Sequence, residues 1–169
     1  MTKIIYYATI INVRSEDMRK ISTMAIAFIC LIVLTGCGGG KKLSCTVEEA
    51  STYNEIDTTG YEIKFEFSKD GKKLNKFTES AYAKYSSSAS KEDLNEVYED
   101  LKDSCKEFND YAGVTCKGNK AGTKLSKTIT VNLGKATPET LKEFYLDTFK
   151  DSSYDEVKKE VEGFGYSCK

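Results

Sequence analysis

The six cysteines of this chain are the residues with the most chemistry available to them, and Cys37 stands in a distinctive context. It follows Leu34, Thr35 and Gly36, and three glycines come after it. A thiol at such a position can take a diacylglyceryl group. The small residues Thr35 and Gly36 would suit the narrow cleft of a peptidase that cuts just before the cysteine. Four residues alone are a weak signal, so the segment that precedes them decides the interpretation.

The segment before Cys37 has the layout of an export signal. Residues 18–20 (Met-Arg-Lys) are a short basic region, and residues 24–34 are an apolar run of 11 residues. That length lies within the roughly 7–15 residues of a signal-peptide core and well below the ~20 that cross a bilayer. The order resembles the signal peptide and lipobox of bacterial lipoproteins. We therefore expect residues 1–36 to be removed and Cys37 to be anchored to the extracytoplasmic face of the cell membrane.

Two other interpretations of this apolar run are a short transmembrane anchor and a buried core helix. The glycines at 38–40 argue against a helix that continues past Cys37, because glycine disfavours helix interiors. Residues 37–42 are better interpreted as a lipidated tether. Residues 1–17 precede a signal peptide that is already complete. Either translation begins at Met18, or the signal peptide has an unusually long N-terminal region.

The composition of the remaining 133 residues argues against several classes of function. The first 36 residues hold 4 of the 25 basic and 2 of the 26 acidic residues, which leaves 21 basic and 24 acidic groups and a net charge of −3. No basic footprint for nucleic acid results. The chain has no His, and its two arginines, Arg14 and Arg19, both lie in the removed segment. The usual general base, the commonest metal ligand and the bidentate fork for phosphate are therefore missing, so we expect no enzyme.

The other cysteines divide by position. Cys30 lies in the apolar run and is discarded, which leaves four cysteines in the exported domain. An even number in an exported domain indicates two disulfides, for which three pairings exist. We favour Cys105–Cys116 and Cys45–Cys168, which on the chain-entropy model contribute about 3 and about 5 kcal/mol. Zinc is disfavoured because the chain has no C-x-x-C pair and no His, so we expect no metal and no cofactor. Four free, buried thiols are the alternative.

Alternation and turn signals predict the strands. Residues 43–49 alternate loosely, and 61–67 alternate strictly with an aromatic or Ile at every second position. Asp70-Gly71 then predicts a hairpin turn, followed by a return strand over 73–85. A second hairpin is expected from strands at 113–116 and 124–133, with a turn at 119–122. Residues 166–169 can add a last strand.

Helices are predicted from caps and apolar spacing. Ser90 to Asp93 resembles a capping box, and the apolar positions behind it predict an amphipathic helix of about 18–20 residues. Thr137-Pro138 predicts a second helix start, with Leu141, Phe144, Tyr145 and Phe149 on its apolar side. Ser153 to Glu156 is a full capping box, and Gly165 suits the C-terminal cap. Two hairpins separated and followed by helices predict one α+β domain over 43–169, an antiparallel sheet built from two hairpins with helices packed on one face.

This arrangement resembles the YehR-like family of small bacterial lipoproteins, a domain of unknown function. The resemblance rests on the hairpin around Ser-Lys-Asp-Gly-Lys-Lys-Leu (68–74) and on the helix from Ser-Lys-Glu-Asp (90–93) to Phe-Asn-Asp-Tyr-Ala-Gly-Val (108–114). The Thr-Ile-Thr-Val strand (128–131) and the terminal Gly-Phe-Gly (163–165) complete it. It implies a lipid-anchored α+β domain and transfers no catalytic residue. The cysteines at 45, 105, 116 and 168 depart from the family's pattern.

The expected function is a non-catalytic binding module of the cell envelope, held to the membrane by lipid, with a protein or peptide as partner. Tyr53, Tyr82, Tyr85 and Tyr111 fall in or near predicted loops and edges, where aromatic residues serve at binding surfaces. Half-buried sheet residues are the other interpretation of the same tyrosines. The alternative function is an envelope enzyme or a thiol-redox protein that uses an exposed cysteine.

Overall fold

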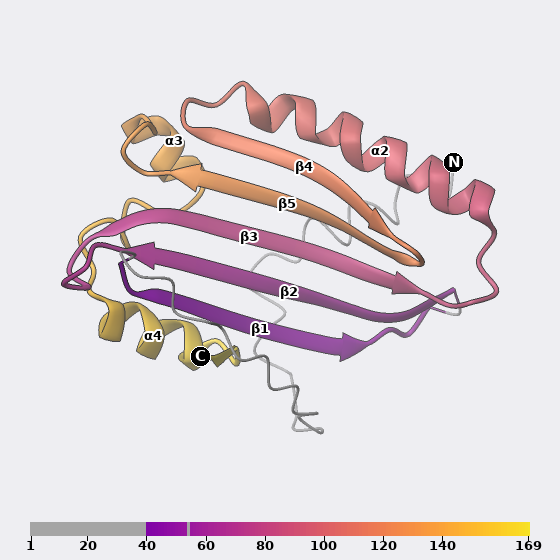
Figure 1. Cartoon of the computed structure of the whole chain (residues 1–169), viewed down its shortest axis with the longest axis horizontal. Coiled ribbons are helices and arrows are strands. Elements are labelled where there is room, and N and C mark those ends of the chain that lie inside the picture. Colours follow the sequence, from indigo (N-terminus) through magenta and orange to yellow (C-terminus); the bar gives the residue numbers. More distant parts are fainter. Residues whose placement is uncertain (1–39, 54) are drawn as a thin grey trace. The chain divides into compact units, whose positions relative to one another are not determined.

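A computed structural model describes residues 40–53 and 55–169, and the labels used here follow Figure 1. The strands and helices follow one another in the order that the sequence suggests. They are β1 (Lys42–Ala50), β2 (Ile56–Phe67), β3 (Leu74–Tyr85), α2 (Lys91–Asn109), β4 (Val114–Ala121), β5 (Lys124–Asn132), α3 (Pro138–Glu143), α4 (Tyr154–Gly163) and β6 (Ser167–Cys168).

All six strands form one sheet in the order β4-β5-β3-β2-β1-β6, and every printed pairing is antiparallel. The expected α+β class with an antiparallel sheet is confirmed. The sheet is larger than two hairpins, because β1 pairs along nine residues with β2 and β6 then pairs with β1. Residues 40–169 form one compact unit.

The alternation of the strands places apolar side chains on one face, which is called the inner face here. Leu43, Phe65, Phe77 and Val131 are aligned across β1, β2, β3 and β5, and each is at most 8 % exposed. Cys105 of α2 and Val157 of α4 belong to the same core cluster. Because side chains alternate across a strand, the residues between these positions point to the opposite, outer face.

Capping side chains fix where the helices begin. The Ser90 hydroxyl accepts the Asp93 N–H at 3.0 Å, and its own proton goes to the Asp93 carboxylate at 2.8 Å. Ser153 and Glu156 make both bonds of the predicted capping box: the Ser153 N–H donates to the carboxylate at 2.8 Å, and the Glu156 N–H donates to the Ser153 hydroxyl at 3.4 Å. Each such cap contributes about 1 kcal/mol.

Two local predictions are wrong. The turn expected at 119–122 begins later, because Asn119 to Ala121 continue β4, and Gly122, with φ +62°, takes the left-handed turn position instead. The helix that begins at Pro138 ends at Glu143, and Tyr145 does not join its apolar side. Tyr145 has φ +54° and is 67 % exposed. Only six residues are helical there, too few to carry an apolar stripe as far as Tyr145.

Each edge of the sheet is engaged along part of its length by another segment. At one edge, Ser44 and Lys169 exchange backbone hydrogen bonds of 3.0 and 2.8 Å. At the other, α2 lies along β4 so closely that a β-carbon built on Gly118 would be 3.3 Å from the Lys102 backbone nitrogen. Uncovered edges invite pairing with another chain. The contacts at Ser44 and along β4 reduce the length of edge that is open to such pairing.

Candidate functional site

The cysteine chemistry divides between two parts of the chain. Cys37, the expected lipidation site, lies outside the described residues. The structure pairs Cys45 with Cys168 and Cys105 with Cys116, the two disulfides favoured from the sequence. Cys45, Cys105 and Cys116 are 0 %, 3 % and 4 % exposed. A disulfide sulfur must be reached by a thiolate before it can exchange, so this burial shields the Cys105–Cys116 bond and the Cys45 sulfur, while Cys168 is half-buried.

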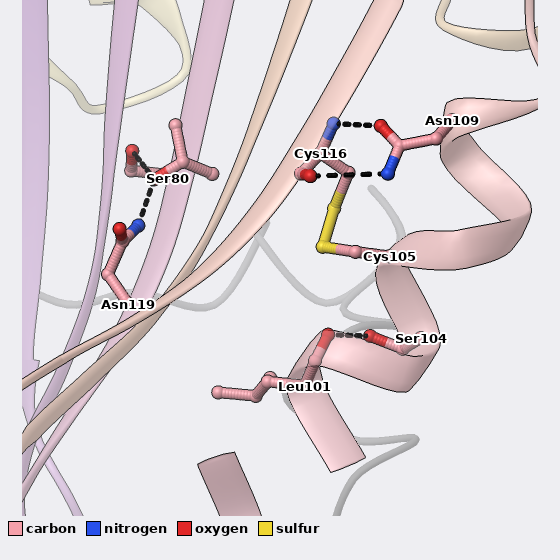
Figure 2. The surroundings of a disulfide bond; sticks show 8 residues. Ser80, Leu101, Ser104, Cys105, Asn109, Cys116 and Asn119 are labelled. Carbon is pink, nitrogen blue, oxygen red and sulfur yellow. Dashed lines mark hydrogen bonds between the residues drawn. A yellow bond between two sulfur atoms is a disulfide. The ribbon is translucent and has the colours of Figure 1, made fainter. Parts of the chain in front are cut away.

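The Cys105–Cys116 disulfide has a partner in holding α2 against the edge strand β4 (Figure 2). The Cys116 N–H donates to the Asn109 side-chain oxygen at 2.7 Å, and the Asn109 amide donates back to the Cys116 carbonyl at 3.4 Å. These two bonds occupy backbone groups of the edge strand that would otherwise be open to another strand. The disulfide and Asn109 together hold α2 against β4 and engage the edge-facing backbone groups of Cys116.

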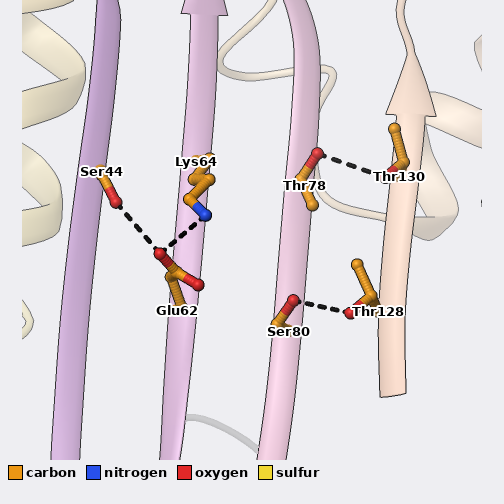
Figure 3. Close-up of polar contacts among 7 residues, drawn as sticks. All are labelled: Ser44, Glu62, Lys64, Thr78, Ser80, Thr128 and Thr130. Carbon is orange, nitrogen blue, oxygen red and sulfur yellow. Dashed lines mark hydrogen bonds and ion pairs between the residues drawn. The ribbon is translucent and has the colours of Figure 1, made fainter. Parts of the chain in front are cut away.

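The outer face is lined by short polar side chains (Figure 3). Across β3 and β5, Thr78 and Thr130 are 3.3 Å apart, and Ser80 and Thr128 are 2.8 Å apart, each pair joined by a hydroxyl–hydroxyl hydrogen bond. Cross-strand pairs of this kind hold side chains in fixed rotamers. The centre of the outer face is therefore a preorganised array of hydroxyl groups.

A charged pair adjoins these hydroxyls on β2. The Glu62 carboxylate accepts a hydrogen bond from Ser44 at 3.4 Å and pairs with the Lys64 ammonium at 2.8 Å. One carboxylate thereby connects β1 to β2 across the outer face, next to the Thr and Ser pairs of β3 and β5.

Tyr82 is the aromatic residue fixed on this outer face. Its ring lies over Gly60, where an added β-carbon would be 2.5 Å from the hydroxyl. The hydroxyl donates to the Glu48 carboxylate, and the Lys124 ammonium lies 3.6 Å from the ring centroid. Partial burial and the Glu48 bond raise the pKa of Tyr82. A tyrosine held by three neighbours loses little side-chain entropy on binding, which favours its use in recognition.

The outer face is basic although the domain is acidic. Six lysines and three glutamates occupy its positions, which is an excess of three positive charges. Because the domain as a whole has a net charge of −3, the rest of its surface carries about −6. Much of that negative charge lies on α2, with three lysines and seven carboxylates. The charged residues of the outer face are Lys42, Lys64, Lys76, Lys84, Lys117, Lys124, Glu48, Glu62 and Glu66.

The inner face holds an ionisable cluster that sequence reasoning missed. Ala81 is paired with Tyr61 on β2 and with Lys127 on β5, and Glu79 is the next inward residue of β3. Lys127 is 6 % exposed, and its ammonium lies 4.6 Å from the centroid of the Phe108 ring. The small side chain of Ala81 leaves room for these larger neighbours.

Burial dominates the electrostatics of this cluster. Desolvation raises the pKa of Glu79 and lowers the pKa of Lys127, while the attraction between the two opposes both shifts. Burial, Glu79 and Tyr61 together raise the pKa of Tyr166 to about 12. Acid–base sites and structural ion pairs both show such shifts. Here the lysine is packed beneath α2, and we assign the cluster to holding the helix over the sheet.

A signal for this cluster exists in the sequence. Glu79 falls between Phe77 and Ala81 in the alternation of β3, and Lys127 falls between Leu125 and Ile129 in β5. A charge at an inward position is costly unless it is compensated, so two such charges on adjacent strands predict a pair. The missing information was which strands are neighbours.

The four tyrosines singled out from the sequence do not converge on one surface. Tyr82 lies on the outer face, and Tyr53 and Tyr85 lie near the same end of the sheet, since Tyr53 accepts from Ile56, the partner of Tyr85. Tyr111 follows α2, and its ring packs edge-on with the Phe144 ring, with 5.7 Å between the ring centroids. Tyr82 is a half-buried residue of the interior strand β3, as the alternative interpretation of these tyrosines had it, and not a residue of a loop or edge.

Within residues 40–53 and 55–169, no three Cys, Asp or Glu side chains are grouped so as to hold a metal ion. None of the helices described in this part of the chain has the length and apolarity to cross a bilayer.

Comparisons with known proteins leave the family open. No protein-family model matches the chain, and no curated protein is significantly similar to it. The NMR structure of a protein from Streptococcus pneumoniae TIGR4 covers 89 % of this chain and 98 % of its own length, at 11 % identity and a TM-score of 0.48. A likeness at that level carries no inference about this chain's fold or function.

Proposed function

We propose that this chain is a lipid-anchored, extracytoplasmic lipoprotein that works as a non-catalytic binding module of the cell envelope. The observation that carries the anchor is the sequence 34–37 at the end of a signal-like segment, together with the cysteine count. Assigning Cys37 to lipid and Cys30 to the removed segment leaves four cysteines, and all four are paired in disulfides. Disulfides persist in proteins outside the reducing cytosol, which fits export.

The outer face supports the binding part of the proposal. It combines the fixed hydroxyl pairs of β3 and β5, the held ring of Tyr82 and an excess of positive charge. Electrostatic complementarity steers binding toward partners of opposite charge. We therefore propose that the partner is an acidic protein surface or peptide that lies flat against β5, β3 and β2.

Membership of the YehR-like lipoproteins stays part of this proposal. It is supported by the order of elements over 43–169, with the hairpins β2–β3 and β4–β5 as the framework and α2 and α4 packed on the inner face. The alternative, a thiol-redox protein, would need an accessible cysteine, whereas the described cysteines are paired and largely buried.

Replacing Cys37 tests the anchor. In cells supplied with a labelled fatty acid, the Cys37→Ala chain should take up no label and should leave the membrane fraction or accumulate as uncut precursor. Cys30→Ala is the matched control, since it removes another thiol seven residues earlier in the same segment. Equal labelling of both variants would contradict the proposal.

A photo-reactive side chain tests the binding surface in intact cells. Placed at Thr128 on the outer face, it should give discrete adducts that Lys124→Glu weakens, because that change reduces the positive charge of the face. Placed at the exposed Asp103 on α2, the same group should give none. Adducts from Asp103 alone would place the partner on the helical side and refute the proposed surface.

A further inference from the structure

We propose that the domain has a second membrane contact, a lysine corner that binds the headgroups of anionic phospholipids beside the lipid anchor. The lysine corner consists of Lys41 and Lys42 at the start of β1 and of Lys69, Lys72 and Lys73 in the β2–β3 turn. All five side chains are exposed. This inference rests on the proposed lipidation of Cys37.

Backbone contacts bring the two segments of the lysine corner together. The Phe67 N–H donates to the Lys41 carbonyl at 2.8 Å, and the Lys41 N–H donates to the Ser68 carbonyl at 3.5 Å. A β-carbon on Gly71 would lie 2.8 Å from the Lys41 side chain. The chain entering from Cys37 is thus fixed against the turn that carries the other three lysines.

The carboxylates near this corner leave it basic. Asp70 is engaged within the turn, where its carboxylate accepts from the Ser68 hydroxyl at 2.5 Å and from the Lys72 N–H at 3.2 Å. The first turn of α4 adds Asp155 and Glu156, and it is tied to the turn by the Tyr154 N–H, which donates to the Gly71 carbonyl at 2.8 Å. Glu66, the cross-strand partner of Lys42, is neutralised by an ion pair with Lys76 at 2.5 Å. With this pair included, six lysines against four carboxylates give +2, in a domain whose net charge is −3.

The length of the tether places this corner at the membrane. Lys41 is four residues after Cys37, and at most ~3.6 Å per residue these four steps span ~14 Å. Because ~14 Å is an upper limit, the tether allows the corner to approach within the electrostatic screening length, about 8 Å at physiological ionic strength, where its charges experience the surface potential of the bilayer. Lys84 lies 11 residues beyond Lys73 along β3, roughly 36 Å away at ~3.3 Å per residue, and Lys124 is its cross-strand partner on β5, so both are outside that field.

A single acyl chain holds a protein weakly, and basic residues beside a lipid are a recognised second signal for anchoring. For a diacylated cysteine the same contact would mainly set orientation. With the lysine corner on the headgroups, the long axis of β3 points away from the bilayer, and the end of the outer face that carries Tyr82 is the one presented to the envelope.

Lysine labelling on vesicles tests the inference. The full chain, processed in its host and purified in neutral detergent, is reconstituted into vesicles of phosphatidylcholine alone or with about 30 % phosphatidylglycerol. A membrane-impermeant amine reagent then labels each lysine, and mass spectrometry measures the rates. The five corner lysines should react at least about threefold more slowly on anionic vesicles. Lys84 and Lys124 should be unchanged, and 1 M salt should abolish the difference, because it shortens the screening length to ~3 Å.

Two triple variants serve as a matched pair. Lys69→Gln, Lys72→Gln and Lys73→Gln together should remove the slowing at Lys41 and Lys42. Lys84→Gln, Lys117→Gln and Lys124→Gln together remove equal charge from the outer face and should leave that slowing intact. Equal effects of the two triples would overturn the inference.

Flotation separates this inference from the proposed anchor. A chain that floats with both vesicle types but shows equal rates keeps the anchor and overturns the lysine corner. A chain that carries no lipid and does not float overturns both. Stronger slowing by soluble poly(glycerol phosphate) on neutral vesicles than by anionic vesicles would assign the corner to an anionic polymer and overturn the lipid headgroup as its ligand.

Discussion

Removing the two disulfides one at a time should cost the domain different amounts of stability, and the difference follows from chain length. The Cys45–Cys168 bond closes 123 residues and the Cys105–Cys116 bond closes 11. On the chain-entropy model these closures correspond to about 4.9 and about 2.8 kcal/mol. Alanine pairs are the suitable replacement, because they remove similar apolar volume at both sites and leave the difference in closure.

Thermal unfolding is the assay. For a domain of this size the unfolding entropy is about 0.27 kcal/mol/K, so the predicted losses lower Tm by roughly 18 °C and 10 °C. Circular dichroism of the mature chain in mild detergent would measure both values. Equal losses, or a larger loss for Cys105→Ala with Cys116→Ala, would refute the reasoning that chain closure dominates, and would indicate that the contact between α2 and β4 matters more than loop length.

Three further changes have defined outcomes. Asn109→Ala should cost about 1–3 kcal/mol and increase aggregation on heating, since it uncovers edge-strand groups at β4, while Asn95→Ala on the exposed side of α2 should cost little. Gly60→Ala should lower the free energy of unfolding by about 1–3 kcal/mol, because the added β-carbon would meet the Val47 carbonyl at 2.7 Å. Gly134→Ala is its control, since the β-carbon there makes only an ordinary contact at 3.4 Å. Chemical denaturation compares each variant with its control. The pKa of Glu79 is raised mainly by burial, so the folded state holds the proton of this carboxyl more tightly than the unfolded state does. The free energy of unfolding therefore falls as pH rises above 4.5 toward the folded pKa. Glu79→Gln should flatten this decline between pH 4.5 and 7, and an unchanged profile would mean that the carboxyl is solvated.

Much of the fold could be predicted because local chemistry specifies it. The strict alternation before Asp70-Gly71 gives β2 and its turn, and Ser90, Thr137 and Ser153 each cap the helix they were expected to begin. The short α3 could not be predicted, because the apolar spacing after Pro138 continues into residues that pack on the core without a helical backbone.

Strand order and the candidate surfaces were beyond the sequence. The cluster of Glu79 and Lys127 exists only because β3 and β5 are neighbours, and that pairing joins residues about 50 positions apart. The hydroxyl pairs of the outer face depend on the same register. Cysteine pairing was easier to predict, since export and an even count leave only three arrangements.

The mass of the N-terminal peptide of the mature protein is the most direct test of the proposed lipid anchor. We predict that protein isolated from the membrane begins at Cys37 and that this residue carries a diacylglyceryl group. A mature chain that begins elsewhere, or a Cys37 with the mass of an unmodified or disulfide-bonded cysteine, would contradict it.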